Sequence, residues 1–127
     1  MNQSTNSDDT LVDVTALVEA QRRFAADRDW VQYHSPKNLV MALSGEVGEL
    51  SEVFQWMTEA DSKEAGRDPN TAQAVRDELA DVLLYLVRLA DVLGVDLNAA
   101  VSAKLRTNAA KYPVSIARGS SRKYTEF

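Results

Sequence analysis

The apolar stripe between residues 39 and 57 limits the possible folds of this chain more than any other feature of its sequence. Its members are spaced 4, 4, 3, 4 and 3 residues apart, and they are Leu39, Leu43, Val47, Leu50, Phe54 and Met57. Such spacing places every member on one face of an α-helix. Ser35 and Pro36 precede the stripe and are typical of an N-cap and a first helical residue, so we expect the helix to begin there.

Three more helices are expected from similar signals. They cover residues 11–28, the residues from an Asn70 or Thr71 cap to Gly94, and those from an Asp96 cap to about Tyr112. The charged segment 58–71 contains Gly66 and Pro69 and is predicted to be a surface loop. No segment of useful length alternates polar and apolar residues as a strand would. The predicted fold class is therefore all-α, with four helices arranged like a bundle.

The composition is typical of one globular domain. The chain has 127 residues, of which 45% are hydrophobic and 26% are charged. We expect a disordered leader over residues 1–9, a folded domain over 10–114 and a tail over 115–127. The polar start does not resemble a signal peptide, and charged residues such as Arg88 interrupt the most apolar run. The expected location is the cytoplasm.

The charge and the missing residue types exclude several functions. The net charge is −5 at pH 7, which argues against binding nucleic acid through a broad basic face. Without cysteine, the chain has no disulfide, no thiolate zinc site and no cysteine nucleophile. His34 is the only histidine, so a metal site within one chain must rest on oxygen ligands.

Two pairs of carboxylates are candidate metal ligands. Glu46 and Glu49 lie three residues apart beside the stripe of the second helix, and Glu78 and Asp81 repeat this spacing on the third. Two helices joined by a loop normally pack antiparallel, which brings the pairs face to face. Converging carboxylates repel one another, and a hard divalent cation such as Mg²⁺ or Mn²⁺ relieves that repulsion. Solvated helix faces carry such pairs as well, so a purely structural role stays open from the residues alone.

Two glycines accompany the first carboxylate pair. Gly45 and Gly48 lie inside the predicted helix, where each costs about 1 kcal/mol relative to alanine. We interpret them as positions that let a ligand or a neighbouring helix approach closely. The destabilisation would then have a functional reason.

Aromatic residues follow each carboxylate pair along its helix. Trp56 lies about 10 Å beyond Glu49, and Tyr85 lies about 6 Å beyond Asp81, at 1.5 Å per residue. This distance suits a nucleotide whose phosphates bind the metal and whose base contacts the rings. Core filling is the alternative for both aromatic residues.

The carboxylate motif also resembles that of a known family. "GEVGE", followed after 28 intervening residues by "ELAD", resembles the E-x-x-E…E-x-x-D signature of the MazG-like all-α nucleoside triphosphate pyrophosphatases. Residues 24–56, 77–90 and 95–114 are similar to one branch, the dCTP pyrophosphatases. The resemblance extends from about Ala20 to Val114, which is most of the chain.

This resemblance implies an activity and a set of site residues. A deoxynucleoside triphosphate, dCTP or a 5-modified dCTP, would be hydrolysed with Mg²⁺ (or Mn²⁺) to the monophosphate and pyrophosphate, which removes unwanted nucleotides from the precursor pool. The implied metal ligands are Glu46, Glu49, Glu78 and Asp81. The implied nucleotide-binding residues are Gln21, Trp30, Gln32, His34, Trp56 and Tyr85. Three residues on one side of the last helix would bind phosphate oxygens unless they form a solvated face: Lys104, Asn108 and Lys111. The resemblance further implies a homotetramer built from two dimers. No nucleic-acid or membrane partner is expected, because the net charge is negative and charged residues interrupt the most apolar run.

The chain departs from the family pattern at two positions. Many members begin the first motif with paired glutamates, and here Gly45 takes the first place. The number of bound metals and the identity of the general base are therefore open. Members of the dCTP branch often have a histidine where this chain has Gln21, so base selectivity can differ.

The predicted mechanism is an in-line attack of water on the α-phosphorus. Glu49 is the candidate to take the proton of that water. The alternative function is a helical oligomerisation or interaction module without chemistry. A di-iron carboxylate bundle is set aside because it normally needs E-x-x-H motifs, which this chain lacks.

Overall fold

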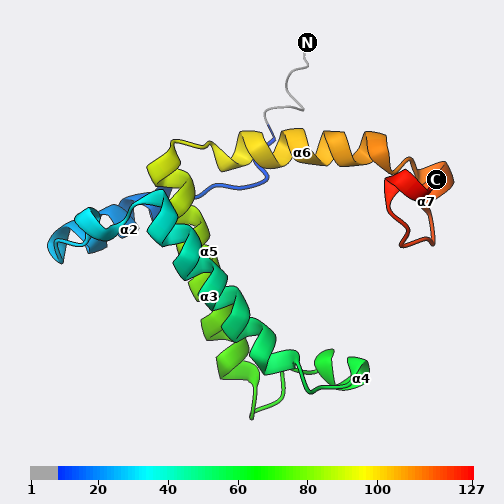
Figure 1. Ribbon diagram of the computed structural model, residues 1–127, viewed down its shortest axis with the longest axis horizontal. Helices are drawn as coiled ribbons and strands as arrows, with labels where there is room; N and C mark the ends of the chain where they lie inside the picture. The colour runs from blue at the N-terminus through cyan, green and yellow to red at the C-terminus, as the bar shows by residue number, and fades with distance from the viewer. Residues whose placement is uncertain (1–8) are drawn as a thin grey trace. The chain divides into compact units, whose positions relative to one another are not determined.

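A computed structural model describes residues 9–127, and the regular structure in that range is helical (Figure 1). The elements are α2 (Thr15–Asp27), η1 (Val31–Tyr33), α3 (Pro36–Phe54), α4 (Glu59–Ser62), α5 (Ala72–Leu93), α6 (Leu97–Lys111), α7 (Val114–Ala117) and η2 (Tyr124–Glu126). No strand forms within residues 9–127, so the all-α prediction is confirmed. The predicted leader lies, apart from Asp9, outside the described residues.

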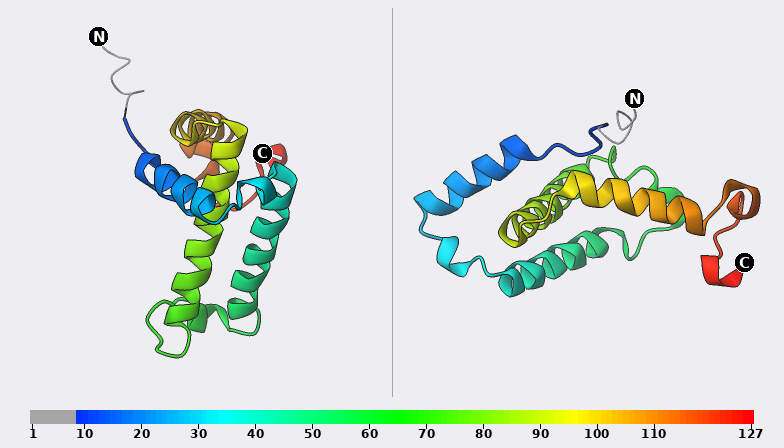
Figure 2. Two further views of the ribbon diagram at one scale, coloured as in Figure 1. Left: turned by 90° about the vertical axis from the view of Figure 1, so that its left-hand side faces the viewer. Right: turned by 90° about the horizontal axis from the view of Figure 1, so that it is seen from above.

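The chain divides into two compact units, one of which carries the predicted carboxylates. This unit spans Thr15–Val95 and contains α2, α3 and α5. Helices α3 and α5 run side by side in opposite directions, as the loop between them predicted, and α2 packs on α5 (Figures 1 and 2). Leu39 and Val87 are its largest fully buried side chains.

Among the described residues, the second unit contains residues 9–14 together with Asp96–Phe127. The backbone N–H groups of Leu11 and Val12 both donate to Oδ1 of Asn98, at 2.8 and 3.0 Å. Near the C-terminus, the ring of Tyr112 packs edge-on against those of Tyr124 and Phe127. The residues after α6 therefore fold back on its end, where the sequence had shown no strong pattern.

The predicted helix ends are largely confirmed. The Ser35 hydroxyl accepts from the backbone N–H of Asn38 at the start of α3. Gly94 ends α5 in the left-handed conformation, with φ of 70°, which costs glycine little. The Asp96 carboxylate then accepts from the N–H of Ala99 and caps α6.

Three local predictions are wrong in detail. The first helix begins at Thr15 rather than at residue 11, because the N–H groups of Leu11 and Val12 bond the Asn98 side chain instead. The predicted loop 58–71 contains one helical turn, α4. Thr71 does precede α5, but its hydroxyl donates to the carbonyl of Ala65 at 2.7 Å and does not cap the helix.

Several large apolar side chains of α3 and α5 stay exposed. Met41 on α3 is 65% exposed, and Leu79 and Leu83 on α5 are 53% and 50% exposed. The packing of α2, α3 and α5 thus leaves part of the predicted stripes uncovered. None of the helices in the described part of the chain is long and apolar enough to cross a membrane.

Candidate functional site

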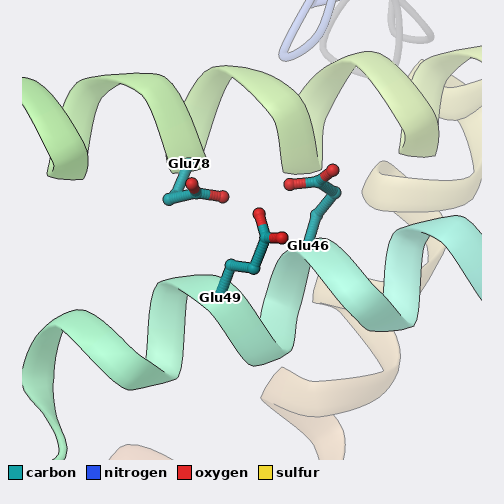
Figure 3. Close-up of side chains that lie close together, drawn as sticks. All are labelled: Glu46, Glu49 and Glu78. Carbon is teal, nitrogen blue, oxygen red and sulfur yellow. The ribbon is translucent and has the colours of Figure 1, made fainter.

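Three of the four predicted metal ligands converge between α3 and α5. Glu46 and Glu49 project from α3 toward Glu78 on α5 (Figure 3). Each contributes one carboxylate oxygen, and these three oxygens lie within 4.8 Å of one another. The i, i+3 spacing on α3 and the antiparallel packing of α5 produce this cluster, as the sequence predicted. We call these three residues the carboxylate cluster.

Burial and mutual repulsion disfavour ionisation within the carboxylate cluster. Burial, together with hydrogen bonding to Glu49 and Glu78, raises the pKa of Glu46 to about 7. The pKa of Glu78 is also raised, chiefly by burial. One oxygen of each, Oε2, is buried without a hydrogen-bond partner among the described residues. Buried unpartnered carboxylate oxygens are rare, and they fit a site that binds a cation.

Asp81 is placed differently from the other three predicted ligands. It is half-buried one helical turn beyond Glu78, and its side chain is not part of the carboxylate cluster. It lines a neighbouring cavity instead. Asp81 therefore lies between the carboxylate cluster and the cavity, where a ligand occupying both would pass it.

The cavity has a volume of about 360 Å³ and lies among α2, α3, α5 and the η1 segment. Its wall is mainly apolar, with residues such as Leu17, Phe24 and Leu39. Four of the predicted nucleotide-binding residues line it, and they are Gln21, Trp30, His34 and Tyr85. A largely apolar cavity with a few polar groups and an acidic cluster beside it is typical of a small-molecule site.

Two predicted nucleotide-binding residues are not among those that line the cavity. The Gln32 amide donates to the carbonyl and to the side chain of Asp29, both at 3.0 Å. Trp56 follows the end of α3 and is 89% exposed. Both assignments stay predictions.

The three predicted phosphate-binding residues all lie on α6, in the other unit of the chain. The Lys111 ammonium lies 4.7 Å from the ring centroid of Tyr124. Lys104 is exposed, and Asn108 is half-buried. Their role in phosphate binding stays a prediction.

The glycines have a different setting from the one expected. A Cβ built on Gly45 or Gly48 would meet nothing within 4 Å among the described residues. The interpretation that a neighbouring helix of this chain approaches these positions is therefore wrong. Both glycines face open space on α3, which leaves room for a ligand or another molecule.

Arg88 is the main site residue that the sequence interpretation missed. It is 8% exposed, and it is one of the residues that line the cavity. Its Nε donates to Nδ1 of His34 at 3.0 Å, and its Nη1 donates to Oδ2 of Asp91 at 3.1 Å. Asp91 also accepts two hydrogen bonds from the guanidinium of Arg22 on α2. The one sequence signal was a charged residue inside the most apolar run of the chain.

Gln21 reaches the cavity from α2 with its amide in a fixed orientation. Its Nε2 donates to the backbone carbonyl of Leu84 at 2.9 Å. Its Oε1 is buried and has no hydrogen-bond partner among the described residues. The amide therefore offers an unpaired acceptor at the cavity wall.

Comparison with known proteins shows which family and which relatives this chain is similar to. The model of the MazG-like family matches residues 41–127. The dCTP pyrophosphatase 1 of Homo sapiens is 50% identical over 117 residues, which cover 92% of this chain and 67% of the human protein. The Bos taurus protein of the same name is 46% identical over 123 residues, covering 97% and 71%. A crystal structure of a pyrophosphatase from Archaeoglobus fulgidus superposes with a TM-score of 0.72 at 39% identity, over 79% of this chain and 92% of the other.

Proposed function

Because the chain belongs to the MazG-like family, we propose that it is a metal-dependent pyrophosphohydrolase acting on deoxynucleoside triphosphates. The expected substrate is dCTP or a 5-modified dCTP, and the products are the monophosphate and pyrophosphate. The observation that carries this proposal is a cluster of three carboxylates with unpartnered buried oxygens beside an apolar cavity.

Glu46, Glu49 and Glu78 would hold the metal ion, and Asp81 would join them when a ligand bridges the cluster and the cavity. All four side chains offer oxygen ligands, which suits Mg²⁺, with Mn²⁺ as a substitute. The unpartnered Oε2 atoms of Glu46 and Glu78 fit this role. When bound, the ion would neutralise negative charge on phosphate oxygens and help to orient a water toward the α-phosphorus.

Glu49 is the carboxylate best placed to accept the proton of the attacking water. It is exposed, whereas Glu46 and Glu78 are half-buried. An exposed carboxylate at the edge of the cluster is accessible to a water that enters from solvent. The proposal assigns Glu49 both to the metal and to proton transfer, and it was the candidate for proton transfer in the sequence analysis.

The layout along α5 supports a substrate extended from the carboxylate cluster into the cavity. Asp81, Tyr85 and Arg88 lie three, seven and ten residues beyond Glu78 on this helix. The last of them is about 15 Å along the axis from Glu78. Phosphates at the carboxylate cluster would therefore leave the base at the far end, against Tyr85, Trp30 and His34.

We extend the proposal to assembly and cellular role. Exposed apolar residues such as Met41, Leu79 and Leu83 would be covered by association with other copies, in a homotetramer built from dimers. The role would be removal of unwanted nucleotides from the precursor pool of the cytoplasm. Neither nucleic acid nor a membrane is an expected partner.

Pyrophosphate release tests the proposal directly. The substrates are the canonical dNTPs and 5-modified dCTPs, each with Mg²⁺ and again with a chelator. We expect magnesium-dependent release that favours cytosine nucleotides. Release that favours another base would keep the reaction and revise the substrate, whereas no release from any triphosphate would favour the interaction module.

A further inference from the structure

A network of charged side chains that the proposed reaction does not use starts at Arg88, which lines the far end of the cavity, and continues behind it to Asp91 and Arg22. Arg22 on α2 donates to Asp91 through Nε at 2.9 Å and through Nη2 at 2.5 Å. Arg88 donates to the same carboxylate and to His34. Asp91 and Arg88 are both buried, with side chains 9% exposed. The protein therefore has a buried ion pair at a position where apolar side chains would pack without the cost of desolvating charges.

The hydrogen bond between Arg88 and His34 determines the protonation state and the tautomer of the imidazole. A guanidinium only donates hydrogen bonds, so Nδ1 of His34 must accept and must carry no proton. The proton of the neutral ring is then on Nε2. Burial and the charge of Arg88 both lower the pKa of His34, which agrees with a neutral ring. Arg88 is the charged group acting directly on this ring, while Asp91 and Arg22 lie behind it.

We propose that Arg88 is a positioning residue, which holds His34 so that Nε2–H donates to an acceptor atom of the bound base. This inference rests on the proposed function, because the base is assigned to this end of the cavity. His34 then serves neither as a cation for phosphate nor as a general base, since Nδ1 is occupied and Nε2 carries the proton. Asp91, held by Arg22, keeps the guanidinium in place on the opposite side.

The base that fits this end must offer an acceptor to His34. Gln21 presents the complementary group, an acceptor whose orientation is fixed by the bond from its Nε2 to the Leu84 carbonyl. Cytosine offers both partners, with ring and carbonyl acceptors next to an exocyclic amine donor. A neutral donor and a fixed acceptor thus recognise the edge of a base rather than an anionic group.

The first test measures the protonation of His34 and does not depend on enzymatic activity. His34 is the only histidine, so NMR of the untagged protein reports its imidazole without ambiguity. We expect the wild-type ring to carry its proton on Nε2 and to titrate with a pKa below 6.5. In Arg88→Met the ring stays half-buried and loses the neighbouring positive charge, so the pKa of His34 should rise. A wild-type pKa at or above 6.5, or a pKa unchanged by the substitution, would overturn the proposal.

The second test separates positioning from structural support. With the preferred dNTP, Arg88→Met should raise KM about tenfold and leave kcat within about threefold, as expected for one lost hydrogen bond to substrate. In a His34→Ala background the same substitution should add little, because Arg88 acts through His34. Equal effects of Arg88→Met in both backgrounds would indicate a structural role and contradict the proposal. Arg23→Met, an exposed neighbour of Arg22, is the matched control.

An inhibitor that lacks a base shows whether His34 contacts the base or the phosphates of the substrate. Inorganic tripolyphosphate should inhibit wild type and Arg88→Met equally, because it would occupy the carboxylate cluster and has no base to extend to His34. A loss of tripolyphosphate inhibition as large as the rise in KM would place His34 on the phosphates and overturn the inference. If wild type releases no pyrophosphate from any dNTP, the proposed function fails, and the NMR titration still decides the role of Arg88.

Discussion

The two ends of the site treat buried charge in opposite ways. In the carboxylate cluster, three groups of the same sign converge, and two of their oxygens are buried without a partner. At the far end, which we call the arginine end (Arg22, Asp91, Arg88 and His34), every link is an opposite-charge pair or a hydrogen bond within the chain. The carboxylate cluster therefore leaves acceptor atoms unpaired, whereas the charges of the arginine end are paired within the chain.

This difference indicates which parts of the site are organised before binding. A cluster that lacks its counter-charge is shifted toward protonation, so its geometry as a ligand set is completed by the ion. A paired network holds its side chains in place and can present a defined hydrogen-bonding pattern. We infer that recognition of the base is preformed, and that the reactive centre is assembled with the metal. The predictions below test this contrast, from the largest expected effect to the smallest.

Loss of a carboxylate ligand should have the largest effect. Glu78→Gln and Asp81→Asn should each lower kcat by about a thousandfold or more, because charge on the phosphates would no longer be neutralised at the reactive centre. Steady-state pyrophosphate release measures the loss, and circular dichroism checks that helicity is retained. Asp77→Asn, an exposed neighbour on α5, is the control. Turnover within tenfold of wild type in either variant would remove that residue from the metal site.

Breaking the arginine end should cost stability. Asp91→Asn leaves the buried Arg88 without its counter-charge, so the free energy of unfolding should fall by about 3 kcal/mol. The matched control is Glu64→Gln, whose pair with Arg67 is 62% and 83% exposed and should contribute less than about 1 kcal/mol. Urea unfolding compares the two variants. Equal losses would mean that the arginine end is no more than a surface ion pair.

The carboxylate cluster should make stability depend on pH in the absence of metal. The pKa of Glu46 rises from 4.5 to about 7 on folding, so the folded protein binds more protons than the unfolded chain between these values. This contribution is complete below pH 4.5 and is lost as pH rises through about 7. With a chelator present, the Tm of wild type should therefore fall between pH 5 and pH 7.5. This fall should be a few degrees larger than the fall in Glu46→Gln. Identical pH profiles would show that the carboxylates are not coupled to folding.

Substitution of Gln21 should have the smallest effect, limited to base preference. Gln21→His replaces a fixed acceptor by an imidazole, so the ratio of kcat/KM between cytosine and thymine nucleotides should change by about tenfold or less. The same panel of dNTPs measures that ratio. Glu19→Gln, an exposed residue on α2, is the control. An unchanged ratio would mean that the Gln21 amide does not contact the base.

The features that the sequence predicted correctly are those with local causes. Ser35, Gly94 and Asp96 act on their own helix ends through bonds a few residues long, and the structure confirms all three. The carboxylate cluster was also predictable, since it needs only the i, i+3 spacing and an antiparallel pair of helices.

The features that were missed depend on contacts between distant residues. Arg88 meets His34 across 54 positions of sequence, and Asn98 bonds the backbone of Leu11 across 87. Neither contact leaves a periodic signal, so Arg88 looked only like an interruption of an apolar run. The glycines of α3 were interpreted from their cost alone, and that cost says nothing about which neighbour approaches.

Binding of Mg²⁺ measured by isothermal titration calorimetry tests the central claim most directly. The claim is that the carboxylate cluster is a cation site whose negative charge no group among the described residues neutralises. We predict that wild type and the control Glu52→Gln, an exposed residue on α3, bind Mg²⁺ alike, and that Glu46→Gln weakens binding at least tenfold, or about 1.4 kcal/mol. Equal binding by all three proteins, or no binding by wild type, would contradict the account.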